Sequence, residues 1–173
     1  MIITSGKYKG RKIIAPPENI TRPTLSKVRM SVFNIAQSII EFEECSFLDM
    51  YAGSGIMGLE ALSRGFKKSV EIEQNSSVLN ILKNNFKLIH DNNSYRIYKG
   101  DSLKIVQKLD ETFDVIYIDP PYFSGIYEKS LQAVKNIAGK IIILEHIKGI
   151  DFGEFQIVKQ KKYGDKLLTV LMK

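Results

Sequence analysis

Carboxylate side chains follow four short apolar stretches of this 173-residue chain, and they belong to Asp49, Glu73, Asp101 and Asp119. Stretches of this kind predict β-strands, and the carboxyl ends of parallel strands line one crevice of a doubly wound sheet. A single such acid would mean little, but four at successive strand ends are hard to explain by packing. Carboxylates gathered there could bind a cationic ligand, ribose hydroxyl groups or N–H groups.

A glycine-rich loop follows the first of these acids. In the segment Leu48–Gly58, the residues Gly53, Gly55 and Gly58 satisfy the pattern G-x-G-x-x-G. Glycine allows a sharp turn and lets a ligand lie against the backbone, although tight strand-to-helix turns without a ligand share this pattern. We expect a cofactor to contact the loop and the nearby acids, at Asp49, Ala52, Gly53, Ser54, Gly55, Glu73, Asp101 and Ser102.

Asp49 discriminates between two classes of cofactor. A pyrophosphate on this loop would be favoured by the helix N-terminus but opposed by the Asp49 carboxylate. S-adenosylmethionine has no phosphate and carries a sulfonium and an ammonium group, which a carboxylate suits. Glu73 lies about 20 residues after Gly53, where an acid commonly binds ribose hydroxyl groups of either cofactor. The sequence therefore predicts S-adenosylmethionine rather than a dinucleotide.

The segment Asp119-Pro120-Pro121-Tyr122 follows the most apolar predicted strand. Each proline fixes its own φ, and a residue before proline avoids helical conformation, so the turn is rigid. It presents a carboxylate, the Pro120 carbonyl and an aromatic ring, which together suit a nucleobase with an exocyclic amino group. A proline-stiffened turn without a ligand is the alternative, but the upstream glycine loop argues against it. We expect these four residues to be catalytic.

The positive charge of the chain is concentrated at its N-terminal end. Residues 1–30 contain seven basic residues and one acid, so they account for the whole net charge of +6. This asymmetry indicates a polyanionic partner, with a solvated surface as the alternative. The residues expected to contact nucleic acid are Lys7, Tyr8, Lys9, Arg11, Lys12, Arg22 and Arg29. Tyr8 lies between two lysines and could stack on a base while they hold phosphates.

The elements that must position these residues can be read from hydrophobic periodicity. Residues 2–4 and 12–14 flank two glycines and predict a small hairpin with a basic tip. A helix is expected from Thr24, its predicted N-cap, with an apolar face formed by Leu25, Val28, Val32, Ile35, Ala36 and Ile39. Strands and helices then alternate, and residues 155–158 and 167–171 predict a closing antiparallel hairpin. We therefore expect an α/β, Rossmann-like, doubly wound sheet that is mostly parallel, in one domain over 1–173 with the basic hairpin and loop of 1–23 appended.

Composition excludes several functions. Cys45 is the single cysteine, so neither an internal disulfide nor a cysteine–histidine metal site is expected, and we predict no metal. No apolar run is long enough for a membrane span and no leader is visible, so we expect a cytoplasmic protein that does not bind membranes.

In these residues the chain resembles the class I S-adenosylmethionine methyltransferases. In that class the motif [DN]-P-P-[YF] marks enzymes that act on exocyclic amines of bases. More narrowly it resembles the RsmD family of bacterial 16S rRNA guanine-N2 methyltransferases. The matching stretches include 6–12, 22–24, 28–29, 33–34, 58–65, Asn85 and 162–164, which span nearly the whole chain. Met30 stands where the family usually has an acid, and Phe66 replaces a common small residue.

The resemblance implies a seven-stranded sheet and methylation of one guanine in ribosomal RNA, within the small subunit or its assembly intermediate, by a monomer. The target base must be looped out or flipped. Tyr122 would stack on it, while Asp119 and the Pro120 carbonyl would accept hydrogen bonds from its amine. The alternatives are an adenine-N6 methyltransferase on DNA or RNA, a nucleotide-dependent dehydrogenase and a non-catalytic RNA-binding protein. The sequence does not distinguish guanine-N2 from adenine-N6 by site residues alone.

Overall fold

A computed structural model describes residues 1–17, 25–121, 125–147 and 149–173 of the chain. Its helices are α1 (Ser26–Gln37), α2 (Ile56–Ser63), α3 (Ser76–Phe86), α4 (Ser102–Val106) and α5 (Ile126–Val134). Its strands are β1 (Ser46–Asp49), β2 (Lys68–Glu73), β3 (Tyr95–Lys99), β4 (Phe113–Ile118), β5 (Ala138–His146), β6 (Gln156–Tyr163) and β7 (Lys166–Met172). Within these residues, none of the helices is long and apolar enough to cross a membrane.

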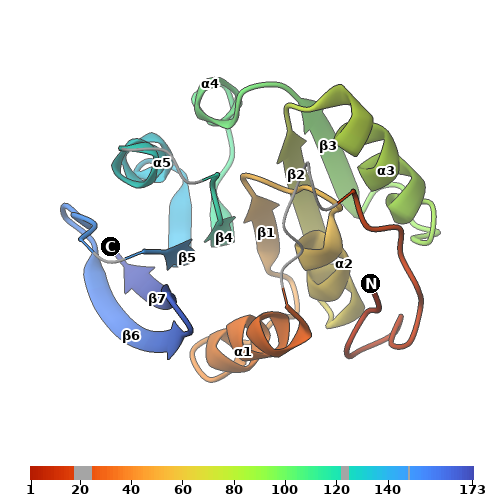
Figure 1. The fold of residues 1–173 in the computed structure, drawn as a ribbon, viewed down its shortest axis with the longest axis horizontal. Coiled ribbons are helices and arrows are strands. Elements are labelled where there is room, and N and C mark those ends of the chain that lie inside the picture. Colours follow the sequence, from red (N-terminus) through yellow and green to blue (C-terminus); the bar gives the residue numbers. More distant parts are fainter. Residues whose placement is uncertain (18–24, 122–124, 148) are drawn as a thin grey trace.

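The strands form one seven-stranded sheet in the order β3-β2-β1-β4-β5-β7-β6 (Figure 1). The first five strands pair in parallel, and β7 pairs antiparallel with both β5 and β6. The predicted α/β sheet with an antiparallel C-terminal hairpin is therefore confirmed. The strand order reverses between β1 and β4, so the crevice where ligands bind doubly wound sheets lies beyond the carboxyl ends of these two strands.

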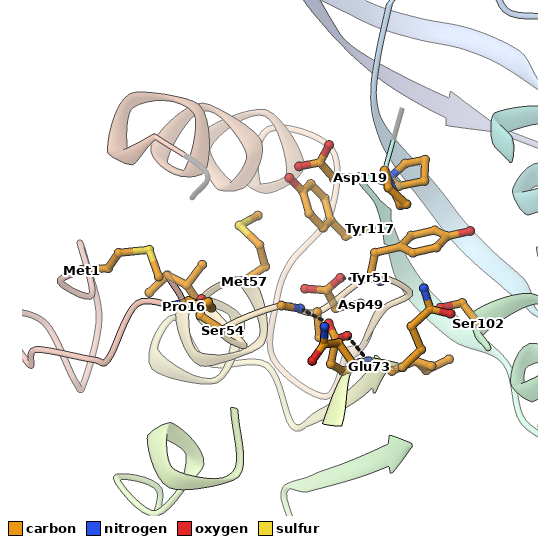
Figure 2. Close-up of a pocket in the computed structure, with 18 of the residues that line it drawn as sticks. Met1, Pro16, Asp49, Tyr51, Ser54, Met57, Glu73, Ser102, Tyr117 and Asp119 are labelled. Atoms are coloured by element: carbon orange, nitrogen blue, oxygen red, sulfur yellow. Dashed lines mark hydrogen bonds between the residues drawn. The ribbon is translucent and has the colours of Figure 1, made fainter. Parts of the chain in front are cut away.

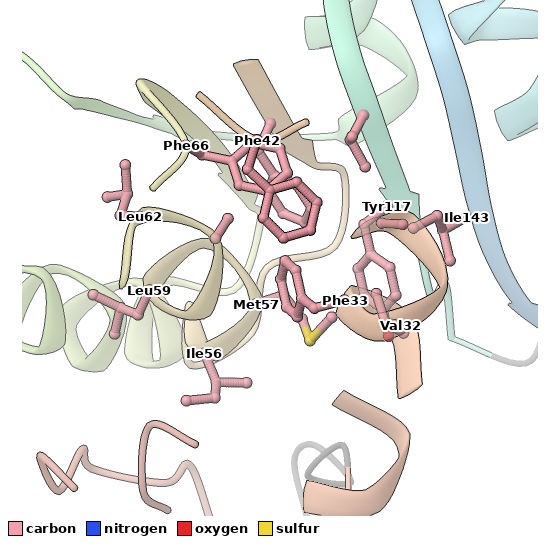
Figure 3. Close-up of a cluster of buried hydrophobic side chains, with 14 of the residues drawn as sticks. Val32, Phe33, Phe42, Ile56, Met57, Leu59, Leu62, Phe66, Tyr117 and Ile143 are labelled. Atoms are coloured by element: carbon pink, nitrogen blue, oxygen red, sulfur yellow. The ribbon is translucent and has the colours of Figure 1, made fainter. Parts of the chain in front are cut away.

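Two hydrophobic clusters hold the layers together, one on each face of the sheet. Side chains of α1, α2 and α3 contribute to the first cluster, and side chains of α4 and α5 contribute to the second. Figure 3 shows the aromatic centre of the first, where Phe33 lies near Phe66 and Tyr117. The ring of Phe47 on β1 lies 5.9 Å from that of Phe33 and 6.5 Å from that of Tyr117. Tyr117 thus anchors β4 in the core just before its carboxyl end.

The N-terminal segment forms a minimal hairpin that packs against the domain. Its pairing consists of one antiparallel bridge between Ile2 and Lys12, supported by the hydrogen bond from Ile3 N to Arg11 O at 3.0 Å. It runs past α2 and α3 (Figure 1) and donates from Lys7 N to Ser63 O at 2.7 Å. Ile3, Tyr8 and Ile13 belong to the first hydrophobic cluster.

A buried carboxylate on α2 fastens this segment to two helices. Glu60 is fully buried and accepts hydrogen bonds from the backbone N–H of Thr4 at 2.8 Å and from its hydroxyl at 2.9 Å. It also pairs with Arg29 of α1 at 3.5 Å and with Arg64 at 3.3 Å. Two cations and two polar donors therefore compensate one buried charge, which is the condition for burying it.

The beginning of α1 differs from the prediction in one respect. Leu25, expected on the apolar face of this helix, is its N-cap residue and is 67% exposed. Thr24, the predicted cap, lies outside the described residues. Of the other residues predicted on this face, Val28, Val32, Ile35 and Ala36 are buried in α1, whereas Ile39 lies beyond the end of the helix and is half-buried.

Candidate functional site

A cavity of about 400 Å³ opens at the carboxyl edge of the sheet, beyond β1, β2 and β4 (Figure 2). Its walls come from the glycine loop, the ends of these strands, the N-terminal segment and the beginning of β7. The lining residues are Met1, Pro16, Asp49, Tyr51, Ala52, Gly53, Ser54, Ile56, Met57, Ile72, Glu73, Gln74, Asn75, Ser102, Tyr117, Asp119, Pro120, Pro121 and Lys166.

The glycine loop uses its glycines for two different purposes. Gly53 lines the cavity with φ +54°, and a Cβ added there would meet no heavy atom within 4 Å. Gly55 is the N-cap residue of α2 with φ +77°, and its Cβ would lie 2.5 Å from the Phe86 ring. Gly53 therefore keeps space open for a ligand, whereas Gly55 permits close packing of the loop on α3.

Glu73 ties the end of β2 to the glycine loop. Its carboxylate accepts hydrogen bonds from Gly53 N at 3.0 Å and from Asn75 N at 2.7 Å (Figure 2). Burial raises the pKa of Glu73, and these backbone N–H groups partly offset that effect. The fixed carboxylate at the cavity wall is arranged to accept hydrogen bonds from ligand hydroxyl groups.

Asp49 is a buried acid with little compensation. It is 1% exposed and accepts one hydrogen bond from Tyr51 N at 3.1 Å. Burial raises its pKa to about 8; the Tyr51 N–H opposes the rise, and the negative charges of Asp119 and Glu73 add to it. Glu71 is its register partner on β2, and burial raises the pKa of Glu71 as well. Among the described residues, Glu71 Oε2 has no hydrogen-bond partner.

Asp119 lies in a network of charged groups from three strands. Lys166 Nζ at the beginning of β7 lies 3.2 Å from Asp119 Oδ1 and 3.3 Å from Glu145 Oε2 on β5. The hydroxyl of Tyr117 donates to the other Glu145 oxygen. Burial raises the pKa of Asp119 to about 7, as does the charge of Glu145, while Lys166 lowers it.

The structure brings most predicted cofactor and catalytic residues together. Asp49, Ala52, Gly53, Ser54, Glu73, Ser102, Asp119, Pro120 and Pro121 all line the cavity. Asp101 and Gly55 are outside this lining. Asp101 is exposed and caps α4 by accepting a hydrogen bond from Lys104 N at 3.2 Å, so its position does not support the predicted contact with the cofactor. Tyr122 lies outside the described residues.

Two of the residues predicted to contact nucleic acid are buried in the structure, so these two predictions are wrong. Tyr8 is 6% exposed and packs in the first hydrophobic cluster, with the Arg11 guanidinium 4.9 Å from its ring, so it cannot stack on a base in this structure. Arg29 is 1% exposed and pairs with Glu60, which removes it from the phosphate-binding set. The side chains of Lys7, Lys9, Arg11 and Lys12 are exposed, and Arg22 lies outside the described residues.

Among the site residues that sequence reasoning missed are Tyr51, Tyr117, Glu145 and Lys166. Glu145 had a detectable signal, because it is an acid directly after the apolar run Ile141–Leu144, and the strand that contains this run extends through His146. Lys166 follows a turn far from the other motifs and carries no such signal. Its place is decided by the antiparallel pairing of β7 with β5.

The fold and the strand-end cavity define a class I methyltransferase. Residues 1–172 match the model of the family described as Conserved hypothetical protein 95, and the chain belongs to this family, the RsmD family of methyltransferases. "Ribosomal RNA small subunit methyltransferase D" of Buchnera aphidicola is 33% identical over 92% of this chain and 78% of its own length. The protein of that name from Escherichia coli is 30% identical over 78% of this chain and 66% of its own length.

Solved structures agree with the fold. The structure of yhhF from Escherichia coli has a TM-score of 0.88 at 23% identity, covering 100% of this chain and 97% of that chain. The rRNA methyltransferase aviRa from Streptomyces viridochromogenes has a TM-score of 0.71 at 11% identity, covering 92% of this chain and 88% of that chain. At these identities the likeness concerns the fold alone, and family and fold together imply an enzyme that depends on S-adenosylmethionine.

Proposed function

We propose that this protein transfers a methyl group from S-adenosylmethionine to the exocyclic N2 amine of a guanine in 16S ribosomal RNA. The observation that carries the proposal is that the glycine loop and the Asp119-Pro120-Pro121 turn line one cavity. The names of the relatives from Buchnera and Escherichia coli support small-subunit ribosomal RNA as the substrate. We further propose that the enzyme acts as a monomer in the cytoplasm, on the small subunit or its assembly intermediate.

The cavity suits a cationic cofactor. Of the described residues that line it, Asp49, Glu73 and Asp119 contribute carboxylates and Lys166 contributes a lysine side chain. Burial and the neighbouring carboxylates raise the pKa of Asp49, and an ammonium or sulfonium group of a ligand would offset this effect. We assign Asp49 to the charged end of S-adenosylmethionine, Glu73 to its ribose and Gly53 to close backbone contact. When bound, this cofactor supplies an electrophilic methyl group.

Asp119 and the two prolines form the substrate side of the site. The exocyclic amine of guanine is a poor nucleophile because its lone pair is delocalised into the ring. A carboxylate that accepts a hydrogen bond from this amine orients it and stabilises the positive charge that develops on nitrogen. Neither proline can donate a backbone hydrogen bond, so the Asp119 oxygens and the Pro120 carbonyl present acceptors to the amine. In this proposal Tyr122 stacks on the base.

The exposed basic side chains of the N-terminal segment complete the proposal. Lys7, Lys9, Arg11 and Lys12 lie on the same segment whose Met1 and Pro16 line the cavity. Phosphate groups of a ribosomal RNA loop would neutralise these cations while the target base enters the site. The segment would thereby position RNA without taking part in methyl transfer.

The test is methylation of small ribosomal subunits that lack the modification, with labelled S-adenosylmethionine, followed by identification of the labelled nucleoside. N2-methylguanosine is the expected product with wild-type protein, and Asp119→Asn should lose on the order of 10² in single-turnover rate. Label in N6-methyladenosine would overturn the assignment of the base. Label in neither nucleoside, with a folded protein, would overturn the proposed activity.

A second measurement tests the cofactor independently of RNA. The demethylated cofactor, S-adenosylhomocysteine, should raise the melting temperature because it binds the folded state. Gly53→Ala should abolish this rise, whereas Gly10→Ala should retain it. Both glycines have positive φ and open surroundings, so the two variants share the backbone cost and differ in their distance from the cavity. A melting temperature that is raised by NAD and not by S-adenosylhomocysteine would overturn the cofactor assignment.

A further inference from the structure

Lys166 reaches the site from the C-terminal hairpin, far from the motifs that define the cavity. It is the first residue of β7 and faces Tyr163 across the hairpin turn. Its ammonium lies 3.2 Å from Asp119 Oδ1 and 3.3 Å from Glu145 Oε2, and its side chain lines the cavity. A single ammonium thus bridges the acid at the end of β4 and the acid near the end of β5.

Besides Lys166, the charged groups of the described residues that act on Asp119 are acidic. Glu145 faces it from β5 and Asp49 from β1, while Tyr117 of β4 donates its hydroxyl to Glu145. Among the side chains of the described residues that line the cavity, Lys166 is the one lysine or arginine. Two close carboxylates without a cation between them would not both stay ionised near neutral pH.

We infer that Lys166 is a positioning residue for methyl transfer: it favours the ionised form of Asp119 and holds Oδ1, so that Oδ2 can accept the hydrogen bond of the substrate amine. Within residues 1–17, 25–121, 125–147 and 149–173, the hydrogen bond that Asp119 accepts from a side chain is made at Oδ1. A protonated carboxyl could still accept one hydrogen bond but would stabilise the developing positive charge less. The inference rests on the proposed function, because it assigns Asp119 to the substrate amine.

Geometry favours this role over a purely structural one. The side chain of Asp119 is 19% exposed and faces the cavity, whereas Glu145 is almost fully buried and is held by Tyr117 from its other side. Glu145 therefore acts as a fixed anchor for the ammonium, and Lys166 transmits this position to the Asp119 oxygen at the cavity wall. Methyl transfer needs its acceptor held within a narrow range, and this linkage supplies that restraint.

The direct test is the titration of the Asp119 carboxyl carbon, followed by ¹³C NMR in wild type, Lys166→Met and Lys166→Arg, with Asp119→Asn to assign the signal. Removing an opposite charge at this distance should raise the Asp119 midpoint by about 1 to 3 pH units, and arginine should restore much of it. Glu145→Gln should move the midpoint down. Lys162→Met, which removes an exposed lysine of the same hairpin, is the matched control and should change nothing.

Single-turnover methylation of small subunits then tests the consequence. In Lys166→Met the acid limb of the rate profile should move up with the Asp119 midpoint. From a midpoint of about 7, a rise of about 1 to 3 pH units should lower the rate at pH 7 by about fivefold to 500-fold, because the ionised fraction of Asp119 falls by that factor. The affinity for S-adenosylhomocysteine should stay within about threefold of wild type. A loss that is equal at every pH, or one that arginine does not relieve, would overturn the positioning role.

The two proposals fail separately. An Asp119 midpoint that is unchanged in a folded Lys166→Met protein would overturn the inference about Lys166, whatever the substrate. Wild-type protein that titrates as expected but methylates neither subunit nor RNA would overturn the proposed function and, with it, the catalytic meaning of the ion pair. Thermal melts identify variants that fail to fold, and Lys166→Gln then replaces Lys166→Met as the charge-free variant.

Discussion

Replacing Asp49 by asparagine should make the stability of the ligand-free protein less dependent on pH while destroying cofactor binding. Asp49 is buried beside Glu71 and its pKa is raised to about 8 from 3.8, chiefly by burial. The folded state therefore binds a proton that the unfolded state releases over this interval. Its stability must fall as pH rises from about 4 to about 8 and level off above that range. Asparagine cannot ionise, so this contribution should disappear.

The magnitude follows from the same two pKa values. One retained proton changes the free energy of unfolding by about 1.4 kcal/mol per pH unit, so wild type should lose up to about 4 kcal/mol between pH 5 and pH 8 from this group. The figure is an upper bound because Glu71 titrates with Asp49. The buried amide that Asp49→Asn introduces costs about 1 to 3 kcal/mol if its N–H groups lack partners. The slope with pH, rather than the absolute stability, is therefore the quantity to compare.

Urea denaturation at several pH values between about 5 and 8.5 measures this slope. The matched control is Asp110→Asn, which changes an exposed aspartate that does not line the cavity and should run parallel to wild type. Calorimetry with S-adenosylhomocysteine should show binding that strengthens with pH in wild type, because Asp49 must ionise to meet the ligand ammonium, and no measurable binding in Asp49→Asn. Parallel stability curves for wild type and Asp49→Asn would refute the reasoning.

Three further outcomes are expected. Replacing Lys7, Lys9, Arg11 and Lys12 by alanine should weaken RNA binding and make the RNA affinity less dependent on salt, by about 0.7 to 0.9 in the log–log slope for each phosphate that is no longer bound. A control variant that replaces Lys104 of α4 and Lys108 just after it should leave both the affinity and the slope unchanged. Gly55→Ala should lower the free energy of unfolding by more than the ~1–2 kcal/mol that a positive φ costs, because the added Cβ meets Phe86. Gly65→Ala should lose only the cost of the positive φ, so equal losses of the two variants in urea titrations would contradict this reasoning. Asn85→Ala should lower both the stability and the cofactor affinity, because Asn85 Nδ2 donates to Ile14 O and Ser54 O at 2.9 Å and so joins the N-terminal segment to the glycine loop. An unchanged dissociation constant for the cofactor would show that the glycine loop does not depend on the N-terminal segment.

The hydrogen bonds of Asn85 connect the N-terminal segment to the cofactor side of the cavity. The uneven charge of this segment suggests an RNA-binding appendage whose loss would hardly affect the cofactor. In the structure, however, Met1 and Pro16 of this segment line the cavity, and Glu60 and Asn85 bind its backbone. RNA phosphates bound at the exposed basic side chains and a cofactor bound in the cavity would therefore contact segments that are joined by hydrogen bonds.

Local chemistry of the sequence was enough to predict the sheet, the glycine loop and the proline turn. In these stretches the structural determinants lie within a few residues of one another: an apolar run that ends in Asp49, glycines that turn the chain, and prolines that hold Asp119 extended. Parallel strand ends then bring such features to one edge in any doubly wound sheet. This is why the sequence by itself places Asp49, Glu73 and Asp119 at a common crevice.

Tertiary structure alone decided which charged and aromatic side chains lie at the cavity or on the surface and which are used for packing. Arg29 and Tyr8 looked available for RNA, yet Glu60 of α2 and the first hydrophobic cluster draw them into the interior. Lys166 looked like an ordinary hairpin lysine, yet the antiparallel register of β7 on β5 carries its ammonium to Asp119, 47 residues away in the sequence. The physical reason is that burial and ion pairing depend on distances between segments, and sequence spacing does not determine those distances until the strands have paired.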